Sequence, residues 1–157
     1  LKNINLKNKF GIFLQKFYVY KLNIYNDYET PWQGTRICKK KDLKSITNLR
    51  KKVKMENLKK AFWKFYYEKN IQIFEDGGWH FNNFYDVETI SVKLINFQNV
   101  DKGLKKANTS HNQIKKKIEN LEDLFYRNHK YKKIEIDNEL PNYIKNNLNL
   151  FENYILK

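Results

Sequence analysis

The stretch IQIFEDGGWHFNNFYDVETISVKLINF, residues 71–97, decides how this chain folds. Residues 71–74 are rich in Ile and Phe, which predicts a β-strand. Gly77 and Gly78 then interrupt it, because glycine allows close approaches and backbone conformations that a Cβ atom forbids. Asp86 predicts the N-cap of a helix through Phe97. One face of that helix is apolar: Val87, Ile90, Leu94 and Phe97.

The flanking sequence predicts further strands and helices of the same mixed kind. Strands are expected within 10–23 (one or two, with 17–22 the better candidate), at 35–38 and at 134–136. Helices are expected from Asp42 as N-cap to 53, and at 57–67, 113–125 and 142–147, the last beginning at Pro141. Strands interspersed with helices predict an α/β fold, with a mixed sheet and flanking helices, in which residues 1–157 form a single domain.

The charge of the chain suggests basic surfaces without identifying a nucleic-acid reader. The formal net charge is +14, from 31 basic and 17 acidic residues. Only Arg36, Arg50 and Arg127 are arginines. Proteins that read bases or clamp phosphates normally use Arg, whose planar fork binds bidentately. We therefore expect no dedicated nucleic-acid partner. A basic groove for an anionic sugar nucleotide is compatible with the same charge.

Cysteine content and hydropathy bear on the compartment. Cys38 is the only cysteine, so an intramolecular disulfide and a cysteine-based zinc site are excluded. No apolar run approaches the roughly 20 residues that a spanning helix needs. We expect a cytoplasmic protein, either free or peripherally attached to a membrane.

The glycine break carries the most informative polar and aromatic residues. Trp79 offers a flat apolar face for a sugar ring, and His80 offers a nitrogen for a metal or a phosphate. Asp76 could remove the proton of an acceptor hydroxyl. The alternative is a structural turn in which Trp79 and Phe81 fill the core, His80 makes a structural hydrogen bond and Asp76 is a turn residue. His111 and His129 are isolated, which is typical of surface or structural histidines.

Four blocks of sequence, spread over residues 17–155, give the chain a family resemblance. The first two are Tyr18, Tyr20, Leu22 and Asn23 followed by Trp32, Gly34, Thr35 and Arg36, and Gly77-Gly78-Trp79-His80-Phe81 followed by Ile90, Lys93, Leu94 and Phe97. The last two are Asp123-Leu124-Phe125 with Arg127, and Leu140-Pro141 with Tyr143, Ile144, Asn146 and Asn147. Together they resemble glycosyltransferase family 17, the β-1,4-N-acetylglucosaminyltransferases.

The resemblance implies the C-terminal part of a larger GT-A-like domain that transfers a hexosamine, GlcNAc from UDP-GlcNAc, to a glycan acceptor with inversion. It implies a divalent metal, Mn or Mg, held by an Asp-x-Asp-type motif that precedes these blocks in the family. This chain would supply acceptor contacts and part of the donor pocket. On this interpretation Gly77 and Gly78 admit the ligand, Trp79 stacks on the sugar and His80 contacts metal or diphosphate. Arg36 and Lys93 would serve phosphate binding or structural pairing, and Trp32 would shape the pocket.

The chain departs from the family pattern at several positions. Asn99 and Asp101 stand where the family usually has His and Glu. The nearest acidic stretches to the metal motif are 27–29, expected to be solvated, and 137–139, expected to be a helix-start carboxylate pair. The absence of a spanning segment suggests a bacterial or viral relative. The alternative function is therefore a catalytically inactive carbohydrate-binding remnant of such an enzyme.

Overall fold

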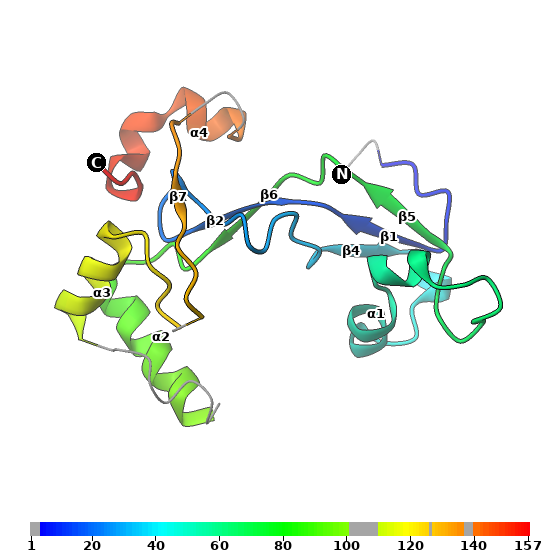
Figure 1. The fold of residues 1–157 in the computed structure, drawn as a ribbon. Coiled ribbons are helices and arrows are strands. Elements are labelled where there is room, and N and C mark those ends of the chain that lie inside the picture. Colours follow the sequence, from blue (N-terminus) through cyan, green and yellow to red (C-terminus); the bar gives the residue numbers. More distant parts are fainter. Residues whose placement is uncertain (1–3, 101–109, 126, 137–139) are drawn as a thin grey trace. The chain divides into compact units, whose positions relative to one another are not determined.

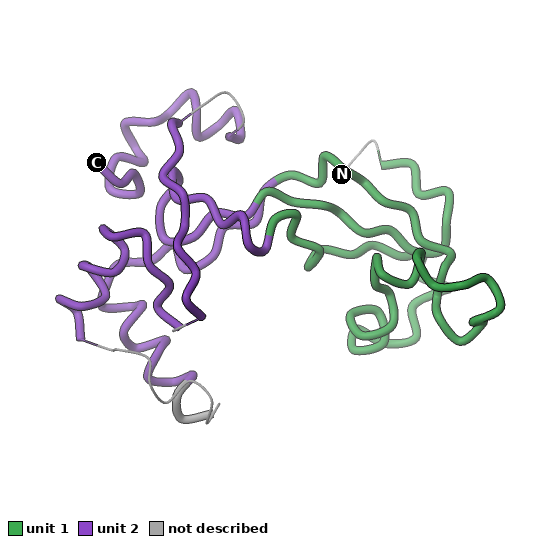
Figure 2. The backbone as a smooth tube through the Cα atoms, viewed as in Figure 1, with its two compact units in different colours: residues 1–16, 30–78 green, residues 17–29, 79–157 purple. Residues whose placement is uncertain are grey.

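The structure, a computed structural model, describes residues 4–100, 110–125, 127–136 and 140–157, with the side chains of 98–100 left aside (Figure 1). The chain divides into two compact units (Figure 2). Unit 1 comprises Leu1–Lys16 and Thr30–Gly78, and unit 2 comprises Phe17–Glu29 and Trp79–Lys157. The predicted mixed sheet with flanking helices is confirmed in kind, as two mixed sheets rather than one. The prediction of a single domain stays a prediction.

Unit 1 is built on a three-stranded sheet with β1 in the centre. Strand β1 (Phe10–Phe13) pairs antiparallel with β4 (Arg36–Cys38) and parallel with β5 (Ile71–Phe74). Helix α1 (Ile46–Lys52) and the 3-10 helices η1 (Lys40–Asp42) and η2 (Met55–Lys59) complete it. The core is a small apolar cluster of Phe10, Ile12, Val53 and Ile71. Burial of such side chains stabilises a fold by about 1.5–3 kcal/mol each.

Unit 2 contains a four-stranded sheet in the order β6-β2-β3-β7. Its strands are β2 (Lys16–Val19), β3 (Ile24–Tyr25), β6 (Trp79–Asn82) and β7 (Lys132–Lys133). β3 pairs antiparallel with both β2 and β7. The amides of Lys16 and Tyr20 donate to the carbonyls of Gly78 and Asn82, a register that runs β6 parallel to β2. The helices are α2 (Val87–Val100), α3 (His111–Glu119), α4 (Asn142–Asn146) and the 3-10 helix η4 (Leu148–Tyr154).

Several local predictions are confirmed. The strands expected within 10–23, at 35–38 and at 71–74 are β1, β2, β4 and β5. The carboxylate of Asp86 accepts the amide of Thr89 at 2.7 Å and so caps α2, as predicted. Ile90 and Leu94 of the expected apolar face are each 2% exposed. Helix α4 begins directly after Pro141, also as predicted.

The helix expected from Asp42 begins three residues later. Ser45 is the N-cap of α1, and its hydroxyl accepts the amide of Asn48 at 3.0 Å. Asp42 lies instead in the preceding 3-10 helix. Both residues are good caps, and the apolar spacing alone did not distinguish them. Ile46, placed on the inner face by that spacing, is 64% exposed.

The helix expected at 57–67 is wrong. Only Met55–Lys59 is helical, as η2, and turns follow it. The side chain of Asn57 donates to the carbonyls of Lys52 and Glu68, at 2.7 and 3.0 Å, and so closes a loop. The aromatic residues of this segment are poor helix formers, because their rotamers are restricted against the preceding turn.

The remaining differences concern short elements of unit 2. The strand expected at 134–136 is wrong, because the residues that pair with β3 are Lys132 and Lys133. Helix α3 ends at Glu119, short of the predicted 125, and Leu121 then takes a positive φ of 62°. Strands β3 and β6 were not predicted. Two-residue pairings and a strand directly after a glycine turn leave little periodic signal.

Candidate functional site

Gly77 and Gly78 are required by the fold for different structural reasons. A Cβ atom at Gly77 would lie 2.6 Å from the carbonyl oxygen of Leu14 and 2.7 Å from its nitrogen. The amide of Gly77 donates to that same carbonyl at 2.9 Å, so the close approach is part of the sheet. Gly78 has a φ of 92° and open space around its Cβ position, so only its backbone conformation demands glycine. Both glycines are explained by the fold before any ligand is considered.

Trp32 and Arg36 lie in unit 1 and are held by neighbouring groups. The indole of Trp32 lies over Gly34, where a Cβ would meet its Nε1 at 2.1 Å. This packing accounts for the Trp-x-Gly spacing. The Nε of Arg36 donates to the carbonyl of Val53 at 2.8 Å, and its Nη1 to that of Gly34 at 3.1 Å. Arg36 was expected to bind phosphate or to pair with groups of the protein, and these two hydrogen bonds are of the second kind.

Asp76 also lies in unit 1, in the exposed turn between β5 and Gly77. Glu75 precedes it and is exposed as well. An exposed carboxylate is available to a ligand, but nothing around Asp76 distinguishes it from Glu75. The assignment of Asp76 as a base stays a prediction.

Trp79 and His80 begin strand β6 of unit 2 and point to opposite faces of its sheet. Successive side chains of a strand alternate, so Trp79 shares a face with Phe81, and His80 takes the other. The ring contacts agree with this alternation. His80 lies edge-on to Phe17 at 4.5 Å between ring centroids, whereas Phe81 contacts Tyr18 at 5.5 Å. The structure therefore does not bring Trp79 and His80 together on one face.

The exposure and charge of these two residues differ too. The Trp79 side chain is 37% exposed. Burial lowers the pKa of His80 below its ordinary value, and the nearby Glu29 carboxylate only partly opposes this. The imidazole of His80 is therefore neutral at neutral pH and can accept as well as donate a hydrogen bond.

Lys93 projects from α2 onto a buried amide. Its Nζ donates to the side-chain oxygen of Asn83 at 2.7 Å, and Asn83 itself has a positive φ of 58°. The ammonium also lies 5.4 Å from the ring centre of Tyr85 and 5.8 Å from that of Phe97. Burial lowers the pKa of Lys93. As for Arg36, these contacts are the structural pairing named among its expected roles.

A polar cluster around Asp123 was not predicted as a site. The Asp123 carboxylate is almost fully buried and accepts hydrogen bonds from Nε and Nη2 of Arg127, at 3.2 and 2.8 Å, and from the hydroxyl of Tyr131 at 2.8 Å. It also accepts the amides of Phe125 and Arg127. On its far side Arg127 reaches Glu29, with Nη1 3.4 Å from Oε2. We call Glu29, Asp123, Arg127 and Tyr131 the carboxylate–arginine cluster.

The ionisation of this cluster is fixed by its contacts. Burial by itself would raise the pKa of Asp123, but the hydrogen bonds from Arg127 and Tyr131 outweigh it and lower the pKa. Burial raises the pKa of Tyr131 and of Tyr20, whose hydroxyl accepts the amide of Leu124 at 3.3 Å. The hydrogen bond to Asp123 raises the pKa of Arg127. Asp123 and Arg127 are therefore charged, and both tyrosines neutral, at neutral pH.

The sequence contained a signal for the cluster, since Asp123 and Arg127 form one of the four blocks. Glu29 belongs to the acidic stretch 27–29 that was expected to be solvated. Asp27 and Tyr28 of this stretch are exposed, whereas Glu29 is half-buried: its carboxylate accepts the side-chain amide of Asn26 at 2.8 Å and faces Arg127. Asp27 instead pairs with Lys132 at 2.6 Å. The two carboxylates thus serve separate ion pairs.

His129 lies beside the cluster in a shallow pocket of about 230 Å³ that Lys117 and Asp123 also line. Its ring stacks on Tyr28 at 4.2 Å with the planes 2° apart. Its Nδ1 is buried and has no partner among the described residues. His111 is exposed at the start of α3. The expectation of structural or surface histidines agrees with both positions.

A metal centre is not formed by the described residues, among which no three His, Cys, Asp or Glu side chains converge. The carboxylate that acts on His80 is that of Glu29, which Asn26 and Arg127 already engage. The divalent metal, Mn or Mg, stays a prediction from the resemblance. Asp101 and residues 137–139 lie outside the described residues, as does the side chain of Asn99.

No family model, curated protein or solved structure matches this chain. The resemblance to family 17 rests on the sequence blocks alone. Among the described residues no helix has the length and apolar character needed to cross a bilayer. The fold is that of a mixed α/β chain with two sheets.

Proposed function

We propose that this chain is part of an inverting glycosyltransferase with a GT-A-like fold, which transfers GlcNAc from UDP-GlcNAc to a glycan acceptor. One observation carries the proposal: sequence blocks far apart in the chain meet around strand β2. Phe81 contacts Tyr18 of β2, and Leu140 and Ile144 pack into the same cluster as Tyr18. The amide of Leu124 donates to the hydroxyl of Tyr20, the residue that follows β2. Blocks that pack in one core depend on one another for stability. A family of proteins is therefore expected to keep these blocks together.

We assign the sugar contact to Trp79. Its indole is partly exposed on a strand that the preceding glycines position. Stacking of an aromatic ring contributes about 0.5–1.5 kcal/mol beyond buried area. His80 lies on the other face of β6 and does not share that sugar; we assign to its neutral imidazole a hydrogen bond to a polar group that reaches that face.

We assign the general base to Asp76. In an inverting transfer the acceptor oxygen attacks the anomeric carbon, the bond from that carbon to the UDP oxygen breaks, and the hydroxyl proton passes to a carboxylate. The products are the glycosylated acceptor, UDP and the proton.

Donor binding tests the sugar assignment. Saturation-transfer NMR should detect the N-acetyl methyl group of UDP-GlcNAc on the 157-residue chain with Mg²⁺ present. Trp79→Ala should weaken binding by about tenfold, as loss of a stacking ring predicts. Trp63→Ala, which removes another exposed indole, should leave it unchanged. Equal binding by Trp79→Ala and the unmodified chain would contradict the assignment.

UDP release from UDP-GlcNAc, measured on the whole transferase of which we propose this chain is part, tests the base. Asp76→Asn should lower the rate of UDP release by about 100-fold or more, because a positioned general base usually accelerates a reaction by at least that factor. Glu75→Gln is the matched control, because it removes the neighbouring exposed carboxylate. If both substitutions leave the rate unchanged, Asp76 is not the base.

A second candidate is a carbohydrate-binding remnant without transferase activity. The observation that favours it is the engagement of Arg36 and Lys93, both expected near phosphate, with protein carbonyl and amide oxygens. A remnant would bind UDP-GlcNAc or a GlcNAc oligosaccharide and release no UDP. The two NMR and UDP measurements together therefore separate the candidates.

A further inference from the structure

Residues 60–69 of unit 1 form a loop with unusual exposure of aromatic rings, here called the aromatic loop. The exposed fractions are 79% for Phe62, 62% for Trp63, 85% for Phe65 and 72% for Tyr66. The Phe side chain has no polar atom that could hydrogen-bond to water, so its exposed apolar surface is unfavourably hydrated. Exposed aromatic clusters of this kind mark interaction surfaces more often than isolated exposed residues do.

The aromatic loop is closed at its base. The buried side chain of Asn57 donates to the carbonyls of Lys52 and Glu68, and the Nζ of Lys69 donates to the carbonyl of Ala61. Between these ties the backbone makes successive turns, with the amides of Lys64 and Tyr67 bonded to the carbonyls of Ala61 and Lys64. Compact loops with joined ends are frequently functional. The exposed rings are thus carried on an anchored loop.

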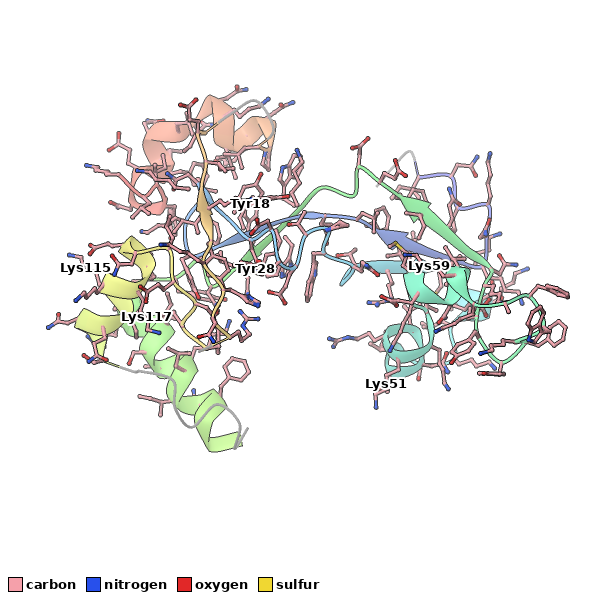
Figure 3. The ribbon with its side chains drawn as sticks, viewed as in Figure 1. Tyr18, Tyr28, Lys51, Lys59, Lys115 and Lys117 are labelled. Atoms are coloured by element: carbon pink, nitrogen blue, oxygen red, sulfur yellow. The ribbon has the colours of Figure 1, made fainter. Side chains whose placement is uncertain are left out.

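Basic residues surround the rings. Residues 50–69 contain eight Lys and Arg but only Glu56 and Glu68 as acids. Three of the bases end α1, and others lie on η2 and within the loop; Lys51 and Lys59 are labelled in Figure 3. Within the described part of the chain, neither Lys51 nor Lys59 forms an ion pair. Such a surface is complementary to a negatively charged one.

We propose that the aromatic loop docks unit 1 onto the surface of an anionic lipid bilayer. Trp and Tyr rings favour the headgroup level of a membrane, and Phe rings insert at the boundary with the acyl chains. Lysine ammonium groups reach anionic headgroups while their stems lie along apolar surface. The chemistry of the occupant is therefore acidic headgroups above an apolar interior. This inference goes beyond the proposed function and does not depend on it.

Single-stranded nucleic acid is the competing occupant, and the composition of the loop disfavours it. Bases stack on aromatic faces that are open to them. The ring of Phe62 lies edge-on to Trp63, 4.9 Å away at 81°, and Tyr66 lies against Tyr67 at 4.4 Å and 40°. These contacts cover only part of the rings of the two pairs. The loop contains no Arg, the side chain most suited to phosphates and bases.

Vesicle flotation tests the proposal with the intact chain. The chain should float with vesicles of phosphatidylcholine and phosphatidylglycerol and remain unbound with phosphatidylcholine alone. Phe62→Ser with Phe65→Ser should reduce the bound fraction by at least about tenfold, since binding scales with the apolar area inserted. Tyr143→Ser, which removes an exposed ring of unit 2, should have no effect. Equal loss in both variants, or no loss in either, overturns the proposal.

Charge reversal provides the second arm. Lys51→Glu with Lys59→Glu should abolish flotation with the anionic vesicles, whereas Lys115→Glu with Lys116→Glu changes the net charge equally on α3 and should preserve it. Equal effects would mean that net charge alone drives binding, which overturns the assignment to the loop. Binding of an oligothymidylate that the loop variants abolish, without vesicle binding by the unmodified chain, would replace the membrane with nucleic acid. UDP-GlcNAc titration of the same variants should be unchanged, which keeps the two proposals distinguishable.

Discussion

In unit 2 the side chains of Phe17, Tyr18 and Tyr20 are at most 2% exposed, whereas in unit 1 Phe62 and Phe65 are 79% and 85% exposed. Charge follows the same contrast. Arg127 in unit 2 is held by a buried carboxylate, while the lysines around the aromatic loop surround exposed rings. Figure 3 labels Tyr18 among the side chains of unit 2. Aromatic rings are therefore buried around β2 of unit 2 and exposed on the aromatic loop of unit 1.

The largest expected effect separates buried from exposed rings. Phe17→Ala should lower the free energy of unfolding of unit 2 by about 3–5 kcal/mol, because it leaves a cavity in the core. Phe65→Ala should change unit 1 by no more than about 0.5 kcal/mol. Urea titration with 5-fluorotryptophan can follow each unit, since Trp79 lies in unit 2 and Trp32 and Trp63 lie in unit 1. Similar losses in both variants would remove the contrast between the units.

The second effect tests the carboxylate–arginine cluster. Asp123→Asn should cost unit 2 about 2–3 kcal/mol, below the full 3–5 kcal/mol of a broken buried pair because Arg127 keeps part of its hydration. The control is Asp27→Asn, whose partner Lys132 is exposed and whose loss should barely change stability. The fluorine signal of Trp79 reports both variants. If the two substitutions cost the same, burial does not govern the strength of these pairs.

The sequence predicted the periodic parts of the fold. Strand β5, the Asp86 cap and the buried residues Ile90 and Leu94 follow from local spacing and capping chemistry. The aromatic loop was predicted as a helix, since its apolar residues have helical spacing. Its conformation is decided instead by the distant contact from Asn57 to Glu68, which no local pattern contains.

The sequence indicated the candidate residues of the site but not the directions in which their side chains point. Trp79 and His80 are adjacent in sequence, which suggested a single site, but strand β6 places their side chains on opposite faces. Asp123 and Arg127 were visible as a motif, but Glu29 is 98 residues from Arg127 and joins it through tertiary structure. Long-range pairings of this kind carry no periodic signal in a single sequence.

The third effect compares the two glycines at the end of unit 1. Gly77→Ala should destabilise unit 1 by about 2 kcal/mol, because its Cβ would press on the backbone of Leu14. Gly78→Ala should cost about 1 kcal/mol, because only the positive φ opposes it. The fluorine signal of Trp32 can follow the unfolding. A larger loss from Gly78→Ala would show that backbone conformation, not the approach to Leu14, limits this turn.

The smallest effect is a pH dependence in unit 2. Because the folded pKa of His80 is lowered from its ordinary value of about 6.5, the folded state binds fewer protons than the unfolded state near that pH. The contribution of His80 to stability is therefore complete above about pH 6.5 and is lost as the pH falls through the folded pKa. His80→Gln should flatten the change in the urea midpoint between about pH 7 and 5, and His111→Gln, at an exposed position, should not. An unchanged slope in His80→Gln would mean that contact with Phe17 does not keep the imidazole neutral, and the hydrogen-bonding role assigned to it would lose its basis.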